Sequence, residues 1–217
     1  MPVILAFGDS NTWGAIPGQD ARMAPDVRWP GVMTRALGLG FQVIEEGLRG
    51  RTTIFDDPDE PGRNGLVYFP PCLLSHAPLD LVIISLGCND TKARFSATPE
   101  MIAAGAERLV EGALASGAGP AGAAPAVILV APPPIAKLTE YAEEFEGGAE
   151  KALRLPAVYR AMARRRGIGF VAAGEFIRCS PLDGIHYAPD QHAVLGRTMA
   201  EAVRMVLERE PVSSPSP

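Results

Sequence analysis

The 217-residue sequence contains only three cysteines, Cys72, Cys88 and Cys179. An odd number of widely spaced cysteines does not make a disulfide framework, and their spacing fits neither a CxxC pair nor a zinc-binding Cys/His pattern. We therefore expect three reduced thiols.

The sequence also lacks a long apolar run. None approaches the roughly 20 residues that a membrane-spanning helix needs. Strand-like residues begin within three positions of Met1, which leaves no room for the charged and apolar regions of a signal peptide. We expect a cytoplasmic protein that has no membrane partner.

The sequence has no excess of positive charge, with 20 Lys and Arg against 25 Asp and Glu and a modest net charge of -5. The one basic run, residues 164–166, lies late in a predicted helix, where cations interact favourably with the helix dipole. The sequence therefore does not predict a nucleic-acid partner.

Short apolar runs alternate with helical patterns along a chain that is 47% hydrophobic. Five runs lack polar alternation, as strands covered on both faces do: Val3–Phe7, Gln42–Ile44, Leu81–Ser85, Val127–Val130 and Ile168–Val171. Helical patterns cover Gly31–Leu37, Cys72–Ser75, Pro99–Ala115, Gly148–Arg166 with an interruption at Pro156, and a last helix from near Pro189. This alternation predicts an α/β fold, a three-layer α/β/α sandwich around five parallel strands.

The length suits one domain with a sizeable core. We expect that domain to cover residues 1–209, followed by a disordered Pro/Ser tail at residues 210–217. Two connections, Arg51–Pro71 and Ala131–Gly148, are longer than a compact domain needs. Such loops are usually functional or disordered. We expect both to line a substrate pocket or a subunit interface, with a mobile, solvated loop as the alternative.

A candidate nucleophile follows the first apolar run. The residues Gly8, Asp9 and Ser10 place a hydroxyl group at the carboxyl edge of the predicted sheet, where open α/β folds bind their ligands. The same residue types are ordinary turn formers, so a plain turn is the alternative interpretation of this segment alone.

Two further segments offer hydrogen-bond donors for an oxyanion. Gly50 follows the second apolar run, and its N–H can point into a cleft because no side chain blocks the approach. Asn89 follows the third run and offers two uncharged N–H donors. A turn glycine and an Asx turn are the local alternatives.

Asp183 and His186 stand three residues apart just before the last helix. This spacing can place the carboxylate beside one ring nitrogen of the histidine while the other nitrogen faces a cleft. His186 is the candidate general base, since histidine titrates near neutral pH and can take and return a serine proton. His76 follows a short predicted helix in an unremarkable context, and the position of His192 in the first turn of the last helix is more typical of a packing or capping residue.

In order, the blocks Gly8-Asp9-Ser10, Gly50, Gly87-x-Asn89-Asp90 and Asp183-x-x-His186 resemble those of the GDSL or SGNH hydrolase superfamily across nearly the whole chain. The surrounding residues, such as 132–134 and 145–148, are similar to the bacterial arylesterase branch, which also contains acyltransferases with perhydrolase activity. The resemblance implies a flavodoxin-like sheet, no metal or other cofactor, and a homo-oligomer of two to eight subunits.

The resemblance also implies a role for each block. Ser10 attacks the acyl carbonyl, His186 relays the proton and Asp183 orients His186. The backbone N–H groups of Ser10 and Gly50 and the amide of Asn89 form the oxyanion hole. The pocket for a small ester is lined by Trp13, Lys92, Phe145 and Ile185. We therefore expect a serine esterase for short-chain acyl or aryl esters, with possible acyl transfer to alcohols or peroxide.

The chain departs from this branch at two places. Arg49-Gly50 replaces a pair of small residues with alanine at the oxyanion position, and residues 137–146 are polar where the branch is commonly apolar and aromatic. A polar mouth excludes water less well, so we hypothesise that transfer to alcohols is weaker than hydrolysis.

Other functions fit some of the same residues. A carbohydrate acetylesterase or a thioesterase would use the same triad. A metal-dependent phosphoesterase would draw on oxygen and nitrogen ligands from Asp9, Asn89, Asp90, Asp183, His186 and His192. It is disfavoured because these groups do not recur in two clusters and Ser10 would have no role. A non-catalytic ligand-binding module is disfavoured because the triad is intact.

Overall fold

The computed structural model describes residues 1–208, so the predicted tail at residues 210–217 lies outside the described part of the chain. Its five strands form one parallel sheet in the order β2-β1-β3-β4-β5. They are β1 (Val3–Gly8), β2 (Gln42–Gly47), β3 (Leu81–Ser85), β4 (Ala126–Ala131) and β5 (Gly169–Ala172). The predicted α/β class, the five parallel strands and the flavodoxin-like order are all confirmed.

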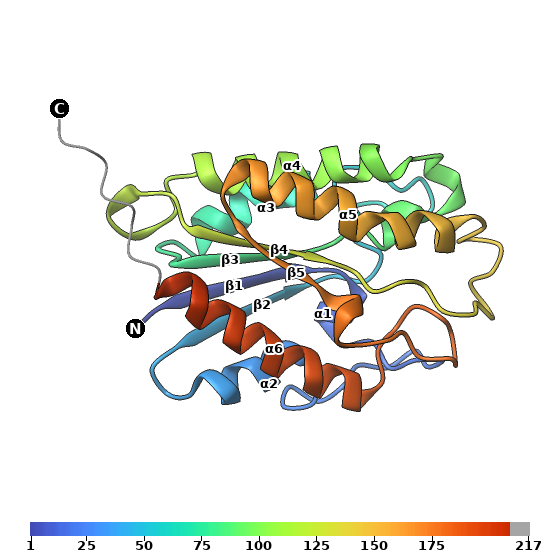
Figure 1. Ribbon diagram of the computed structural model, residues 1–217, viewed down its shortest axis with the longest axis horizontal. Helices are drawn as coiled ribbons and strands as arrows, with labels where there is room; N and C mark the ends of the chain where they lie inside the picture. The colour runs from blue at the N-terminus through green and yellow to red at the C-terminus, as the bar shows by residue number, and fades with distance from the viewer. Residues whose placement is uncertain (209–217) are drawn as a thin grey trace.

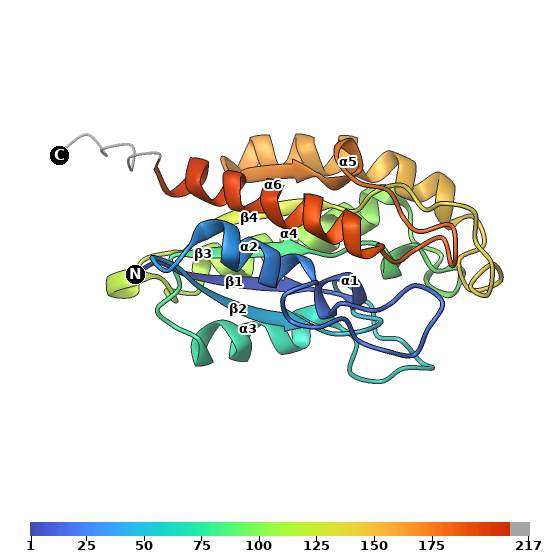
Figure 2. The ribbon, with the colours of Figure 1, turned by 90° about the horizontal axis from the view of Figure 1, so that it is seen from below.

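Helices cover both faces of this sheet (Figure 1). On one face lie α3 (Gly65–Ser75), α4 (Pro99–Ala115) and α5 (Gly148–Arg166), and on the other α2 (Trp29–Leu37) and α6 (Pro189–Leu207). The view from below shows α2 and α6 side by side on the same face of the sheet (Figure 2). Alternate residues of β1 serve the two layers, since Leu5 packs with the first and Ile4 with the second.

The helix α3 is longer than the sequence predicts. It begins at Gly65, within the predicted loop Arg51–Pro71, because Asn64 caps it by accepting the N–H of Leu66 at 3.1 Å. Pro70 and Pro71 lie inside the helix. Both are exposed, so water can reach the backbone carbonyls that lose an N–H partner there. The predicted short helix Cys72–Ser75 is therefore only the end of α3.

The predicted interruption of α5 at Pro156 is also wrong, since the helix runs unbroken from Gly148 to Arg166. Buried residues on both sides of the proline, Leu155 and Tyr159 among them, pack into the core above the sheet. We attribute the continuity to this packing, which holds the helix despite the missing hydrogen bond at Pro156.

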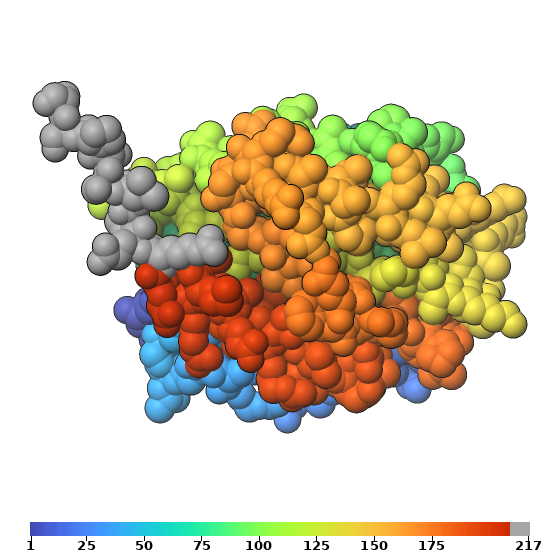
Figure 3. Space-filling model, viewed as in Figure 1, coloured from blue at the N-terminus to red at the C-terminus, as the bar shows by residue number. Residues whose placement is uncertain are grey.

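The connections that follow the strands gather at the carboxyl ends of the strands. They include the short helices α1 (Ser10–Trp13), η1 (Asn89–Thr91), η2 (Ala93–Phe95) and η4 (Ala173–Glu175), while η3 (Pro120–Gly122) precedes β4. In the space-filling view the segment after β4, drawn in yellow, forms the outer rim of this end (Figure 3). No helix of the described residues has both the length and the apolar character needed to cross a membrane.

Candidate active site

Ser10 is the first residue of α1, and only Asp9 separates it from the end of β1. Asp9 caps this helix, since its side chain accepts the N–H of Asn11 at 2.9 Å. A side chain at Gly8 would collide with Thr12 and lie 2.9 Å from the carbonyl oxygen of Ser85. The strand can therefore turn into the helix here only because position 8 has no side chain, and this turn sets the Ser10 hydroxyl at the edge of the sheet.

Ser10, His186 and Asp183 form a continuous chain of polar contacts. The Nε2 atom of His186 lies 3.0 Å from the Oγ atom of Ser10, and its Nδ1 atom lies 2.8 Å from the Oδ2 atom of Asp183. All three residues are buried. This geometry can transfer a proton from the serine hydroxyl to the imidazole while the carboxylate fixes the ring's tautomer and orientation.

The Asp183 carboxylate is held in its ionised form. Burial raises its pKa, but hydrogen bonds from the His186 ring and from the backbone N–H groups of Ile185 and His186 outweigh burial and bring the pKa to about 2. Gly18 N–H also donates to Oδ2 at 3.1 Å. A carboxylate with this pKa stays negative at neutral pH and can stabilise a protonated His186.

The sequence interpretation overlooked Asn11, which joins the two distant halves of the site. Its Nδ2 group donates to the carbonyl of Ile185 at 3.3 Å, and its Oδ1 atom accepts the N–H of Tyr187 at 3.1 Å. These bonds fix the segment around His186 against the helix that carries Ser10. A buried Asn beside the candidate nucleophile was the available signal, but its partners are 174 and 176 residues away in sequence.

The three residues proposed from the resemblance for an oxyanion hole line one cavity with His186. Its volume is about 180 Å³, and Ser10, Gly50 and Asn89 are on its wall. Gly50 has a φ of 73°, a left-handed conformation that favours glycine. The side chain of Arg51 donates to the carbonyl of Gly8 at 2.9 Å, and its own carbonyl accepts from Asn89 Nδ2 at 3.1 Å. Arg51 thereby ties the Gly50 turn to both neighbouring strand ends.

Three of the four predicted substrate-binding residues, Lys92, Phe145 and Ile185, line the same cavity. Trp13 is not on the wall of this cavity. Its ring instead lies against the guanidinium groups of Arg22 and Arg49, 5.0 and 5.5 Å from the ring centroid. Arg49 itself is on the cavity wall, so Trp13 contacts the site through that arginine.

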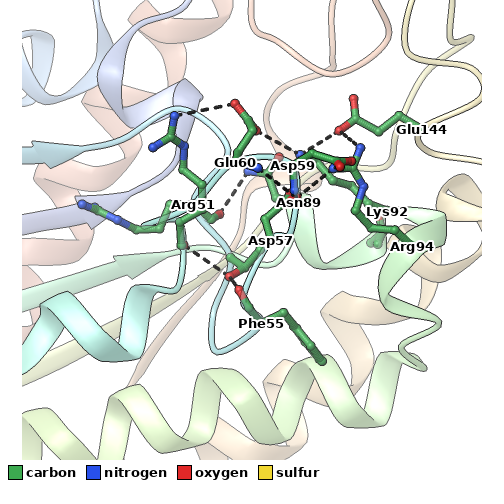
Figure 4. Close-up of polar contacts among 12 residues, drawn as sticks. Arg51, Phe55, Asp57, Asp59, Glu60, Asn89, Lys92, Arg94 and Glu144 are labelled. Atoms are coloured by element: carbon green, nitrogen blue, oxygen red, sulfur yellow. Dashed lines mark hydrogen bonds and ion pairs between the residues drawn. The ribbon is translucent and has the colours of Figure 1, made fainter.

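The mouth of the cavity is strongly charged. Glu60 and Glu144, from the two long connections, line it together with Tyr141, whose ring meets the His186 ring edge to face at 6.0 Å. Lys92 joins the two connections, since its Nζ atom lies 2.8 Å from Glu144 and 3.5 Å from Glu60 (Figure 4). Both connections that the sequence singled out thus contribute walls to this cavity.

The ion pairs at the mouth extend into a network that includes a buried carboxylate, that of Asp57. Lys92 lies 3.5 Å from Asp57, whose side chain is fully buried, and Arg94 donates to Asp57 at 2.8 Å and to Glu144 at 2.9 Å. Burial raises the pKa of Asp57, but the N–H of Asp59 and the neighbouring cations together lower it below its usual value. The network therefore holds the Asp57 carboxylate in its ionised form at neutral pH.

The residues considered as phosphoesterase ligands do not converge. His192 is buried away from the cavity, where its Nδ1 atom accepts the N–H of Trp29 at 3.1 Å and burial lowers its pKa to about 4. Asp90 accepts the N–H of Thr53 at 2.9 Å. Within residues 1–208, these acidic and imidazole groups form no cluster of three ligand atoms. The geometry therefore does not support a metal centre at this edge of the sheet.

Comparisons with known proteins place this chain in a family. Residues 6–194 match a family model described as the GDSL-like Lipase/Acylhydrolase family. The structure of the native aryl esterase of M. smegmatis is similar over 95% of this chain and 100% of its own, with 47% identity and a TM-score of 0.92. Est24, a carbohydrate acetylesterase from Sinorhizobium meliloti, is similar over 94% and 99%, with 42% identity and a TM-score of 0.91.

A carbohydrate acetylesterase family member from the same organism is 37% identical over 96% of this chain and 100% of its own, with a TM-score of 0.91. The comparison with curated proteins found no match. The family match and the high identity over almost the full length establish that the chain belongs to the GDSL-like lipase/acylhydrolase family and is a carboxylic ester hydrolase.

Proposed function

We propose that this esterase hydrolyses small acyl esters through a covalent intermediate on Ser10. The observation that carries the proposal is the chain of contacts from Ser10 Oγ to His186 Nε2 at 3.0 Å and from His186 Nδ1 to Asp183 Oδ2 at 2.8 Å. His186 accepts the hydroxyl proton as Oγ bonds to the acyl carbon, then returns that proton to the leaving alcohol. A water molecule, deprotonated by His186, then attacks the acyl-enzyme and releases the acid and Ser10.

The oxyanion that forms in each step needs donors already in place. Within the described residues, the backbone N–H groups of Ser10 and Gly50 donate to no protein acceptor. Asn89 uses one of its two N–H donors on Arg51, which leaves the other for the oxyanion. Removing one such donor typically costs about a hundred- to thousandfold in rate.

The cavity volume of about 180 Å³ favours a short acyl group such as acetyl. A phenyl ester is our first candidate substrate, because the M. smegmatis protein at 47% identity is an aryl esterase. Acetylated carbohydrates are the second candidate. The observation that favours them is the mouth lined by Arg49, Glu60 and Glu144, since carboxylates and guanidinium groups hydrogen-bond readily to hydroxyl groups.

We also propose that this enzyme releases its acyl group mainly to water. The charged side chains at the mouth keep water in reach of the acyl-enzyme, which favours hydrolysis over transfer. The ratio of new ester to free acid, measured with added alcohol, tests this point, and a majority of transfer product would contradict it. The homo-oligomer implied by the resemblance and the cytoplasmic location expected from the sequence remain predictions. Light scattering after size-exclusion chromatography measures the oligomeric state.

The nucleophile itself can be tested by covalent labelling. A serine-directed phosphonate should add once to the wild-type protein, on the peptide that contains Ser10, and should not add to Ser10→Ala. Ser75→Ala, which changes an exposed serine at the end of α3, is the matched control and should label normally. Intact-mass measurement gives the number of phosphonate groups per chain, and peptide-mass measurement identifies the labelled peptide. Labelling of Ser10→Ala at wild-type stoichiometry would refute the proposal.

A further inference from the structure

A second group of chemically active side chains lies between the edge strand β2 and α3. Its members are Glu46, Cys72 and His76, and one ligand atom from each lies within 4.8 Å of the other two. The Nε2 atom of His76 is 2.9 Å from the Oε1 atom of Glu46. None of the three lines the cavity that contains Ser10, so the proposed catalytic mechanism gives them no role.

The fold brings these residues together by the regular geometry of its elements. Glu45 pairs with Arg28 on one face of β2, so Glu46, the next residue, points to the opposite face, where α3 packs. Cys72 and His76 are four residues apart at the end of α3, and the N–H of His76 donates to the carbonyl of Cys72 at 3.3 Å. Residues with this spacing lie on the same side of a helix.

We propose that Glu46, Cys72 and His76 bind a zinc ion that links α3 to β2. A thiolate, an imidazole and a carboxylate are the side-chain ligands that zinc prefers, at about 2.0 to 2.3 Å. A tetrahedral ion at those distances separates its ligand atoms by about 3.3 to 3.8 Å. The observed separations, all within 4.8 Å, exceed these values by about 1.5 Å at most, so the side chains must move closer together to hold the ion. A thiolate ligand disfavours magnesium and calcium, which take oxygen ligands.

The surrounding charges are compatible with a divalent ion. Arg51 is a neighbouring cation, with its guanidinium group 4.1 Å from the Phe7 ring centroid and bonded to the backbone carbonyl of Glu46. The carboxylate of Glu46 and the thiolate of Cys72 together balance the charge of Zn²⁺, so the occupied site presents no net charge to Arg51. Tyr68 donates to Glu46 Oε2 at 3.3 Å, which orients the carboxylate in the way that outer hydrogen bonds orient metal ligands.

Solvent reaches the cluster at one ligand, and binding has a cost. Glu46 and Tyr68 line a surface cavity of about 660 Å³. Burial, followed by the nearby Glu46 carboxylate, raises the pKa of the Cys72 thiol to about 12. Binding of the ion must therefore displace that proton. Since the ion would connect two elements of the folded chain, it should stabilise the fold without entering catalysis.

Untagged full-length protein, stripped with a chelator and dialysed, should be titrated with Zn²⁺ by calorimetry and with Co²⁺ by absorbance. We expect one Zn²⁺ per chain, a rise in Tm, and a Co²⁺–thiolate charge-transfer band. Cys72→Ala should lose the band. Cys179→Ala, which removes another buried thiol, should keep it as the matched control. His76→Ala should weaken Zn²⁺ binding about tenfold or more.

Absence of the thiolate band in the wild type would overturn the proposal, and so would a band that survives in Cys72→Ala. If Cys72→Ala fails to fold, His76→Ala decides the question. The His76 side chain is 29% exposed, so its truncation spares the core, and unchanged Zn²⁺ affinity in that variant would refute the site. Esterase activity should be the same in His76→Ala and the wild type, so this test is independent of the proposed function.

Discussion

Replacing Asp183 with asparagine should disable His186 while leaving the shape of the site nearly unchanged. The Oδ1 atom of Asp183 accepts two backbone N–H groups, from Ile185 and His186, at 3.0 Å each. The amide oxygen of an asparagine should keep that place, which puts its NH₂ group opposite His186 Nδ1 and the N–H of Gly18. An NH₂ group donates to Nδ1, so the ring proton moves to Nε2, which then cannot accept the proton of Ser10. We expect kcat to fall about 10⁴-fold.

The same substitution should lower stability. The pKa of Asp183 is about 2 in the folded chain against an ordinary 3.8, a difference worth about 2 kcal/mol at neutral pH. Between those two pH values the unfolded chain binds more protons, so this stabilisation is complete above pH 3.8 and is lost as pH falls through 2. The asparagine variant should lack this stabilisation. Its NH₂ group also faces the N–H of Gly18, and two donors cannot form a hydrogen bond with each other.

Steady-state hydrolysis of p-nitrophenyl acetate and urea unfolding at pH 7.5 measure the two effects. Asp190→Asn is the matched control, since Asp190 is an exposed carboxylate in the first turn of α6, and it should change neither value appreciably. If Asp183→Asn keeps kcat within tenfold of the wild type, the assigned role of Asp183 is wrong.

Three further substitutions test other parts of the site. Asn89→Ala should lower kcat about 10²- to 10³-fold with little change in KM, and an effect mainly on KM would argue against an oxyanion donor. Burial raises the pKa of Asp90 to about 6. The folded chain therefore holds this proton more tightly than the unfolded chain, and stability falls as pH rises from 3.8 to 6. Asp90→Asn should therefore show a smaller drop in Tm between pH 4.5 and pH 7.5 than the wild type. An equal drop in both proteins would show that this reasoning is wrong. Lys92→Met leaves Asp57 and Glu144 with one cation fewer and should cost roughly 3 kcal/mol in urea unfolding, whereas a change near zero would mean that the network contributes little.

The sequence predicts the sheet well because its signal is local. Runs such as Leu81–Ser85 are buried on both faces, and their composition alone indicates this. The first part of helix α3 was missed because adjacent prolines at positions 70 and 71 are typical of loops, whereas here they lie on an exposed part of a capped helix. The exposure of these two prolines depends on how the whole chain packs, so the local sequence pattern does not predict it.

The candidate site likewise combines features that short sequence motifs predict with features that depend on distant residues. Ser10, Asn89, Asp183 and His186 stand in short motifs with known spacing, so the sequence is enough to propose them as site residues. The bonds that Asn11 makes to the His186 segment are not detectable in this way, because they span more than 170 residues. The cluster of Glu46, Cys72 and His76 was likewise overlooked, since its carboxylate comes from a different element than its thiol and imidazole.

The most direct test of the account compares the wild type with Ser10→Ala in the hydrolysis of p-nitrophenyl acetate, each with and without chelator. We predict that the wild type turns over, that chelator does not change its rate, and that Ser10→Ala lowers kcat by about 10⁴-fold or more. Retention of activity in Ser10→Ala, or its abolition by chelator, would contradict the assignment of Ser10 as the nucleophile.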